Sequence, residues 1–402
     1  MSSVGACALA ISAGRRAPAQ EQAFALGDDV LLRDHLDDLT GRHIGIITNQ
    51  SGVTSSHVSI VDALVSNRSA QVHALFGPEH GLRGDHSAGA YVSSYTDERT
   101  GLPVYSLYGP TRHPSRQMLS GIDLLLFDIQ DVGARMYTFV STMAYAMQSA
   151  AKYDIEFWVL DRPNPVGGEI VEGPVLDPRY SSFIGLYPIA MRHGMTVGEL
   201  AQLYNEHFGI GARLRVIKMD GWRRSTIWPQ THLEWVRTSP NIPTWLTCFV
   251  YLCAGLIDDM GLNNGIGTLT PFFFAGAQQL NADEFAERMN ALALPGFAFE
   301  AAQWTPQEGA NAGKTFSGVR FNVLDPARLL PVHAAVQLLV TARDLQAGVV
   351  AASNDRAVDI DWGTDTVRSQ VLAGGSAGEI TGSWTGGVDA FMPLRERFLL
   401  YS

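Results

Sequence analysis

The sequence predicts an α/β protein with a doubly wound parallel sheet in its first half and α+β structure in its second half. Its 402 residues are enough for two or three domains with proper cores. In the first half, short and continuously apolar runs alternate with helical stretches, which is typical of parallel strands covered on both faces. Further along the chain this alternation stops. We therefore expect two domains, at residues 30–243 and 244–402.

The elements of the first half follow in a regular order. The apolar runs predict strands at residues 44–48, 71–76, 124–129 and 156–160. The clearest helical stretch between them covers residues 135–151. An alternation of this kind predicts helices packed on the faces of a parallel sheet.

Helix-start signals and longer strands characterise the rest of the chain. Thr196 and Asn281 are each followed three residues later by a glutamate, the spacing of a capping box at a helix N-terminus. A glycine-rich loop is expected at 261–271. The remaining expected elements are strands at 213–219, 297–304 and 317–324 and a helix at 327–345.

Composition excludes several classes of partner. The chain has 29 basic and 40 acidic side chains, a net charge of −11, and no basic block, which argues against nucleic acid or an anionic membrane as partner. No apolar run is long enough to span a membrane. The three cysteines form no disulfide framework. Residues 5–13 resemble a short signal-peptide core without a preceding basic region, so we expect a cytoplasmic protein, with a secreted or periplasmic one as the alternative.

Polar clusters follow each of the four expected strands. The carboxyl ends of parallel strands meet at one edge of a sheet, where ligands bind. Glu79 stands out because it lies between a proline and a histidine at a strand end, whereas solvated glutamates prefer helix surfaces. The clusters lie at 49–52, 77–86, 128–135 and 161–174.

Several of these polar residues also have a structural interpretation. Asp128 can cap the helix that follows it, and Asp161 with Arg162 can form a local ion pair that shapes a turn. Asn164 precedes a proline, where asparagine commonly makes turns, and His193 precedes a glycine in an expected loop. The sequence alone leaves both interpretations open for these residues.

Standard catalytic motifs are absent, which leaves carboxylate chemistry. The first strand leads into Asn49-Gln50-Ser51-Gly52 rather than a dinucleotide fingerprint, and no Walker loop, HExxH or G-x-S-x-G occurs. Glycoside cleavage needs only two carboxyl groups, and Glu79 and Glu172 are the natural pair in loops shaped by glycine and proline. The alternative is a metal-assisted hydrolase with ligands at Glu79, His80, Asp85 and His86.

Seven motifs in order resemble the NamZ-type exo-β-N-acetylmuramidase family, which was long catalogued as a domain of unknown function. They include FGPEHGLRG at 76–84, FDIQDVGARMYT at 127–138 and LDRPNPVGG at 160–168. The others are TNQSGVTS at 48–55, VEGPVLDP at 171–178, LYPIAMRHGMTVGEL at 186–200 and SPNIP at 239–243.

The resemblance implies a Rossmann-like catalytic domain, a smaller α+β domain and an active site in the cleft between them. It implies hydrolysis of terminal N-acetylmuramic acid from peptidoglycan fragments in cell-wall turnover and recycling, without a metal or organic cofactor. Glu79 matches the catalytic glutamate, and Glu172 is assigned as its partner. The positions expected to line the sugar site are Asn49, His80, Arg83, Asp128, Arg135, Tyr137, Asp161, Arg162, Asn164 and His193.

One loop departs from the family pattern. An acidic position and two arginines of the family correspond here to Asn264, Ile266 and Thr270. Muramic acid carries a lactyl carboxylate, and an arginine is its best recognition partner. The substrate is therefore expected to be N-acetylmuramic acid or a related amino sugar, and the alternative is a catalytically silent carbohydrate-binding protein. The other arginines that could supply the cation are Arg83, Arg135, Arg162 and Arg192.

Overall fold

The computed structural model describes residues 24–67, 70–84, 86–87, 89–90 and 93–402. A seven-stranded sheet in the order β3-β4-β2-β1-β5-β6-β9 forms the first half. The chain extends the sheet from β1 to β2 and β4 on one side and then through β5, β6 and β9 on the other, which confirms the predicted doubly wound α/β fold. The strands are β1 His43–Thr48, β2 Gln71–Gly77, β3 Tyr95–Thr96, β4 Pro103–Ser106, β5 Leu124–Asp128, β6 Glu156–Leu160 and β9 Arg213–Ile217.

All neighbouring strands of this sheet are parallel except β3 and β4, and helices cover both of its faces. Leu125 and Phe127 of β5 belong to the core under α3 and α4, whereas Leu124 and Leu126 belong to the core under α1 and α2. Both faces of β5 are therefore buried, which explains its continuous apolar sequence. The helices are α1 Gly27–Asp34, α2 Ile60–Ser66, α3 Phe139–Tyr153 and α4 Val197–Glu206.

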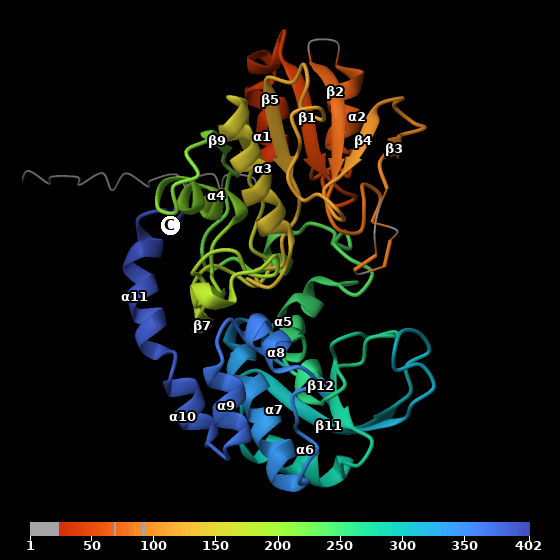
Figure 1. The fold of residues 1–402 in the computed structure, drawn as a ribbon, viewed down its shortest axis with the longest axis vertical. Coiled ribbons are helices and arrows are strands. Elements are labelled where there is room, and N and C mark those ends of the chain that lie inside the picture. The colour runs from red at the N-terminus through yellow and green to blue at the C-terminus, as the bar shows by residue number, and fades with distance from the viewer. Residues whose placement is uncertain (1–23, 68–69, 85, 88, 91–92) are drawn as a thin grey trace, which may run out of the picture.

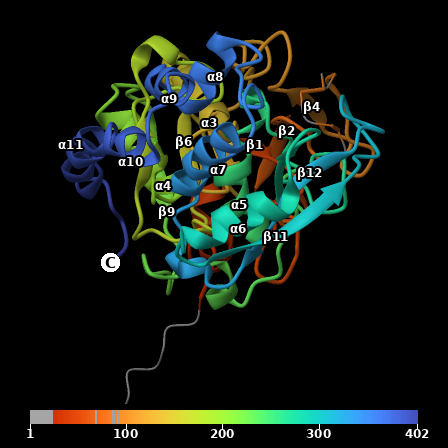
Figure 2. The same cartoon turned by 90° about the horizontal axis from the view of Figure 1, so that it is seen from below.

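The second half packs helices on a small antiparallel sheet of order β10-β12-β11 (Figures 1 and 2). Its hydrophobic core is continuous with the core under α3, because α5 and α7 contribute to the same cluster of buried residues. The elements are α5 Trp245–Ala254, β10 Phe274–Ala277, α6 Ala282–Ala291, β11 Phe297–Trp304, β12 Phe316–Val323 and α7 Pro331–Leu345, followed by α8 Asp355–Trp362, α9 Thr366–Leu372, α10 Ala377–Gly382 and α11 Thr385–Glu396.

The end of the chain returns to the first half. Figure 1 shows α11 running from the second half back along the first, and it contacts the two-stranded ribbon of β7 Glu172–Val175 and β8 Ala190–Arg192. Beyond α11, the hydroxyl of Tyr401 donates a hydrogen bond of 2.6 Å to Asp161. The division into domains at 243/244 stays a prediction.

One predicted boundary differs from the structure. The helix expected from residue 135 begins only at Phe139, because residues 134–138 are held in a turn. The backbone N–H of Arg135 donates to the carbonyl of Met191 at 2.8 Å, and Ala134 forms a bridge with Arg192. These contacts join the turn to the β7–β8 ribbon and leave Met136, Tyr137 and Thr138 beside the cavity described next.

Candidate functional site

A cavity of about 450 Å³ lies between the two halves of the molecule. This volume falls in the range of small-molecule sites, and its lining is mainly apolar and aromatic with a few polar groups, as such sites usually are. Its lining residues are Glu79, His80, Tyr108, Arg112, Met136, Tyr137, Thr138, Ser182, Phe183, Ile184, Ser239, Asn241, Ile242, Tyr251, Ile266, Phe272 and Ile360. We call it the Glu79 cavity.

Glu79 lies in a tight turn directly after β2. The turn needs left-handed backbone at His80, with φ of 71°, and at Gly81, with φ of 79°. The Glu79 carboxylate accepts hydrogen bonds from the Thr138 hydroxyl at 2.7 Å and from the Gly89 N–H at 2.9 Å. Among the described residues it forms no ion pair with arginine or lysine. The carboxylate is therefore oriented without being neutralised.

Aromatic side chains surround this carboxylate. Burial raises the pKa of Tyr108, and the charge of Glu79 and a hydrogen bond to it raise that pKa further, so the phenol stays protonated. The Tyr137 hydroxyl donates to the Thr238 hydroxyl at 2.8 Å. The rings of Tyr251 and Phe272 meet edge to face with centroids 5.0 Å apart. Such a wall suits the apolar faces of a sugar ring.

The structure places three of the predicted site residues in the cavity: Glu79, His80 and Tyr137. The buried ring of His80 uses Nδ1 in a hydrogen bond of 2.9 Å with the carbonyl of His86. Ile266, at one of the positions that departs from the family pattern, also lines the cavity. Asn264 instead holds its loop, with Nδ2 donating to the carbonyl of Ala254 at 3.3 Å and Oδ1 accepting from the N–H of Ile266.

Glu172 is not brought into the Glu79 cavity. It lies on β7, buried, and its Oε1 accepts from the backbone N–H of His333 at 2.6 Å and lies 3.0 Å from Nδ1 of the same residue. His333 is in the first turn of α7, where backbone N–H groups lack partners in the helix and the helix dipole attracts a carboxylate. Glu172 thus lies in the position of a helix cap, and its Oε2 is buried without a hydrogen-bond partner among the described residues. Its assignment as the partner of Glu79 stays a prediction.

Asp128 and Arg162 belong to a buried ion network at the carboxyl edge of the sheet. Arg162 donates from Nε to Asp128 at 2.5 Å and from Nη2 to Asp28 at 2.7 Å. Burial alone would lower the pKa of Arg162, but the charges of Asp128 and Asp28 outweigh it and raise that pKa. Burial raises the pKa of Asp28 and of Asp128, and the charge of Arg162 opposes that rise at both carboxyl groups. We call these three residues the edge network.

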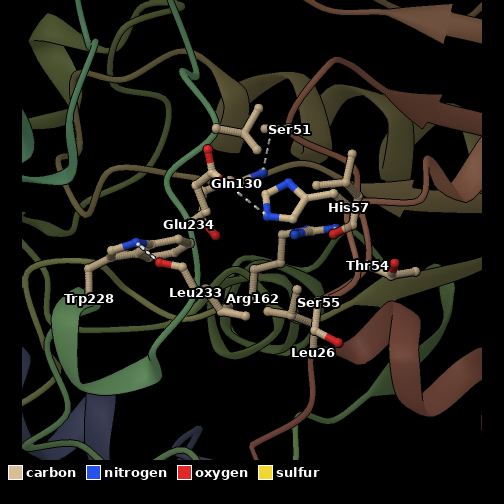
Figure 3. Close-up of a pocket in the computed structure, with 12 residues that line it drawn as sticks. Leu26, Ser51, Thr54, Ser55, His57, Gln130, Arg162, Trp228, Leu233 and Glu234 are labelled. Atoms are coloured by element: carbon tan, nitrogen blue, oxygen red, sulfur yellow. Dashed lines mark hydrogen bonds and ion pairs between the residues drawn. The ribbon is translucent and has the colours of Figure 1, made fainter.

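The pocket beside the edge network is too small for a sugar. Figure 3 shows Ser51, Gln130 and Arg162 among the residues around it, and the backbone N–H of Gln130 donates to the Ser51 hydroxyl at 3.0 Å. Its volume is about 20 Å³, which is room for about one water molecule. Asn49 lies nearby, with its side-chain oxygen accepting from the N–H and the hydroxyl of Ser51.

Two further predicted residues hold backbone segments together. Arg135 donates from Nη1 to the carbonyl of Pro174 at 2.7 Å and from Nη2 to that of Asp361 at 3.2 Å, and burial lowers its pKa to about 9. His193 accepts from the N–H of Met195, and burial lowers its pKa to about 3, so the imidazole is neutral. Neither side chain lines the Glu79 cavity.

The remaining predicted residues are also engaged away from the cavity. Asp161 accepts from the Thr196 hydroxyl at 2.8 Å and from the N–H of Gly198 at 2.8 Å. Asn164 donates to the carbonyl of Met195 at 3.0 Å. Arg83 pairs with Asp97 at 2.7 Å. Asn164 also accepts from the N–H of Val166 at 3.1 Å, which agrees with its structural interpretation as a turn residue. The local ion pair expected between Asp161 and Arg162 is not formed, because the guanidinium of Arg162 binds Asp128 and Asp28 instead.

Two of the sequence-based hypotheses fall on residues that the structure does not describe. Asp85, one of the four expected metal ligands, lies outside the described residues, as does the segment 5–13. In the described part of the chain, no group of three or more His, Cys, Asp or Glu side chains is arranged to hold a metal ion. Within the same part, none of the helices is both long and apolar enough to cross a membrane.

The sequence analysis missed several residues of the cavity, among them Tyr108 and Arg112. Both follow β4, a four-residue strand that begins with a proline and gave no clear apolar run. Had this strand been recognised, its position in the sheet would have placed the following polar cluster at the same edge as Glu79, because β4 is parallel to β2. For Thr138 and Tyr251, no sequence pattern indicated a position in the cavity.

Comparisons with known proteins agree with this architecture. The N-terminal model of the exo-β-N-acetylmuramidase NamZ family matches residues 44–246, and its C-terminal model matches residues 249–401. A curated peptidoglycan β-N-acetylmuramidase NamZ of Bacillus subtilis (strain 168) is 44% identical over 383 residues, which cover 95% of this chain and 92% of the relative.

Two crystal structures of DUF1343 family proteins from Bacteroides fragilis NCTC 9343 share the fold. One superposes with a TM-score of 0.89 at 34% identity, and the other with 0.76 at 27%. Each comparison covers 94% of this chain and 99% of the other. On the two matching domain models and the extended identity to the curated relative, the chain belongs to the exo-β-N-acetylmuramidase NamZ family.

Proposed function

We propose that the protein is a glycosidase that releases terminal N-acetylmuramic acid from peptidoglycan fragments. The observation that carries the proposal is Glu79, an oriented carboxylate without a cationic partner among the described residues, in a cavity of about 450 Å³. The B. subtilis relative, which is 44% identical, is a peptidoglycan β-N-acetylmuramidase, and this supports the same reaction class here.

In this proposal Glu79 is the acid/base group. Its carboxyl gives a proton to the glycosidic oxygen as the bond breaks and, once ionised, takes a proton from the incoming water. The Thr138 hydroxyl and the Gly89 N–H hold the carboxyl in place, and Tyr108 supplies a second hydroxyl beside it. Because Glu172 is bound to the start of α7, the second role of a two-carboxylate mechanism falls to a group other than Glu172.

The first test is hydrolysis of two chromogenic glycosides, β-N-acetylmuramide and β-N-acetylglucosaminide, with and without a chelator. We expect release from the muramide that is indifferent to chelator. Release from the glucosaminide alone would contradict muramate as the substrate, and loss of activity with chelator would favour the metal-assisted hydrolase. Silence on both would favour the carbohydrate-binding alternative, which a sugar-binding titration would then test.

The second test is Glu79→Gln, which keeps the shape of the side chain and removes its proton and charge. We expect kcat to fall by about 10²- to 10⁴-fold, the usual contribution of a general acid or base. The matched control is Glu98→Gln, because Glu98 is an exposed glutamate of the same half. Turnover near the wild-type level in Glu79→Gln, with an unchanged melting temperature, would contradict the assignment.

The cellular setting is part of the proposal. We propose a cytoplasmic enzyme of cell-wall recycling that acts on small peptidoglycan-derived disaccharides or muropeptides, since the cavity has room for only a few sugar rings. Fractionation of cells that express the full chain, followed by activity measurement in each fraction, tests this location. Activity confined to the medium or the periplasm would overturn it.

A further inference from the structure

One cation faces the Glu79 cavity. Arg112 is the single arginine or lysine among the described residues that line it. Its guanidinium carbon lies 4.0 Å from the ring centroid of Phe183 and 5.8 Å from that of Tyr108. In the part of the chain that the structure describes, Arg112 has no carboxylate partner. Stacking on a ring fixes the plane of a guanidinium and leaves its N–H groups free to bind an anion.

The loop that carries Arg112 is attached to α3. The Thr111 hydroxyl donates to the carbonyl of His113 at 2.8 Å, closing the turn around Arg112. The ring of His113 packs on Tyr145 with centroids 4.2 Å apart, and its Nε2 lies 3.1 Å from Oε1 of Gln148. These contacts anchor the loop, and the stacking on Phe183 positions the guanidinium before any ligand binds, which reduces the entropy lost on binding.

Arg112 and Glu79 flank the same phenol. Both act on Tyr108: the carboxylate of Glu79 adds to the effect of burial in raising its pKa, whereas the charge of Arg112 opposes that rise. The guanidinium carbon of Arg112 lies 5.8 Å from the ring centroid of Tyr108, and Glu79 lies at the hydroxyl of the same residue, so both charged groups border the same part of the cavity. A pyranose bound over Tyr108 would therefore present one substituent to Glu79 and another to Arg112.

The other candidate arginines are already occupied. Arg83 pairs with Asp97, and Arg162 pairs with two aspartates of the edge network. Arg192 donates to the carbonyls of Leu329 at 2.9 Å and of Val166 at 2.6 Å. Arg135 likewise binds backbone carbonyls. None of the four lines the Glu79 cavity.

We propose that Arg112 binds the lactyl carboxylate of N-acetylmuramic acid and thereby selects this sugar over N-acetylglucosamine. The proposal rests on the proposed function and adds the residue that sets specificity. The two sugars differ by the lactyl ether on O3, so a carboxylate bound there is the feature that distinguishes them. Arginine binds a carboxylate through two parallel hydrogen bonds, a geometry that a lysine cannot reproduce.

The test compares three chromogenic substrates: the β-N-acetylmuramide, the same compound with its lactyl carboxylate converted to a neutral N-methylamide, and the β-N-acetylglucosaminide. In Arg112→Met we expect kcat/KM for the acid to fall by about 100-fold, as for loss of hydrogen bonds to a charged group. For the two neutral substrates we expect a change of less than threefold. Arg116→Met is the matched control, since Arg116 is exposed in the same loop and does not line the cavity.

The outcomes separate this proposal from the proposed function. If the wild type hydrolyses none of the three substrates, the proposed function fails, and this proposal fails with it. If the wild type is active, then an equal loss on acid and neutral substrates, or no loss, overturns the role of Arg112 alone. Should Arg112→Met fail to fold, Arg112→Lys keeps the charge, and we expect a smaller loss that is again confined to the acid. An equal loss on acid and amide in that variant would also overturn the proposal.

Discussion

Two charged regions lie just past the carboxyl ends of the central strands, and they use their charges in opposite ways. In the edge network, Arg162 is bound on both sides by Asp28 and Asp128, and the pocket beside it has room for about one water. In the Glu79 cavity, a carboxylate and a guanidinium both face an open volume of about 450 Å³, and neither has an ionic partner among the described residues. One region stabilises the fold, and the other has groups left to bind a ligand.

The difference shows why polar residues at a sheet edge do not by themselves mark a site. Asp161, Arg162 and Asn164 are buried, and each makes hydrogen bonds to other groups of the protein. A buried charge needs such partners, because an unpaired one costs several kcal/mol. A binding group instead keeps part of its hydrogen-bonding capacity for the ligand.

The largest effect that this comparison predicts is on stability, in Arg162→Met. Methionine fills a similar volume but leaves the Asp128 carboxylate buried without its partner, so the free energy of unfolding should fall by about 3–5 kcal/mol. Denaturant unfolding measures this. Adding Asp128→Asn should recover part of the loss, because it removes the uncompensated charge. A loss below about 1 kcal/mol in Arg162→Met would show that the edge network does not stabilise the fold as inferred.

The next effect concerns pH and His193. Burial lowers the pKa of His193 to about 3 in the folded protein, whereas an unfolded histidine titrates near 6.5. Below pH 6.5 the unfolded chain takes up a proton at His193, whereas His193 stays neutral in the folded chain. The free energy of unfolding therefore decreases as pH falls from 6.5 towards 3. The loss approaches about 1.4 kcal/mol for each pH unit in that window.

His193→Asn isolates this contribution, because asparagine can accept the same N–H of Met195 without titrating. Denaturant midpoints measured between pH 7 and pH 4 should fall more steeply for the wild type than for the variant. Parallel curves for the two proteins would mean that the pKa of His193 is the same in the folded and the unfolded state, which would contradict the shift caused by burial.

The sequence predicted the fold better than the site, and the reason is physical. Strand β6 matched its predicted range. Its side chains are buried on both faces of the sheet, and this burial requires the continuous apolar run from which the strand was predicted. The capping box of Thr196 and Glu199 formed as expected, because both partners are local in sequence. By contrast, the partners that occupy the polar residues are distant: Arg162 and Asp28 are 134 residues apart, and Glu172 and His333 are 161 apart. The residues next to a carboxylate do not indicate a partner so distant in the sequence. A carboxylate that has such a partner therefore cannot be distinguished by sequence pattern from one that has none.

The smallest expected effect is that of Glu172→Gln, and it decides between the two roles considered for this residue. Glutamine can still accept the N–H of His333 but brings no charge to the start of α7. A charge at a helix N-terminus contributes up to about 2 kcal/mol in a partly buried setting, so we expect the free energy of unfolding to fall by about 1–2 kcal/mol. Because Glu172 lies outside the Glu79 cavity, kcat on the muramide should stay within about twofold of the wild type. A fall of 100-fold or more at unchanged stability would instead make Glu172 a partner of Glu79 and would require that β7 moves into the cavity when substrate binds.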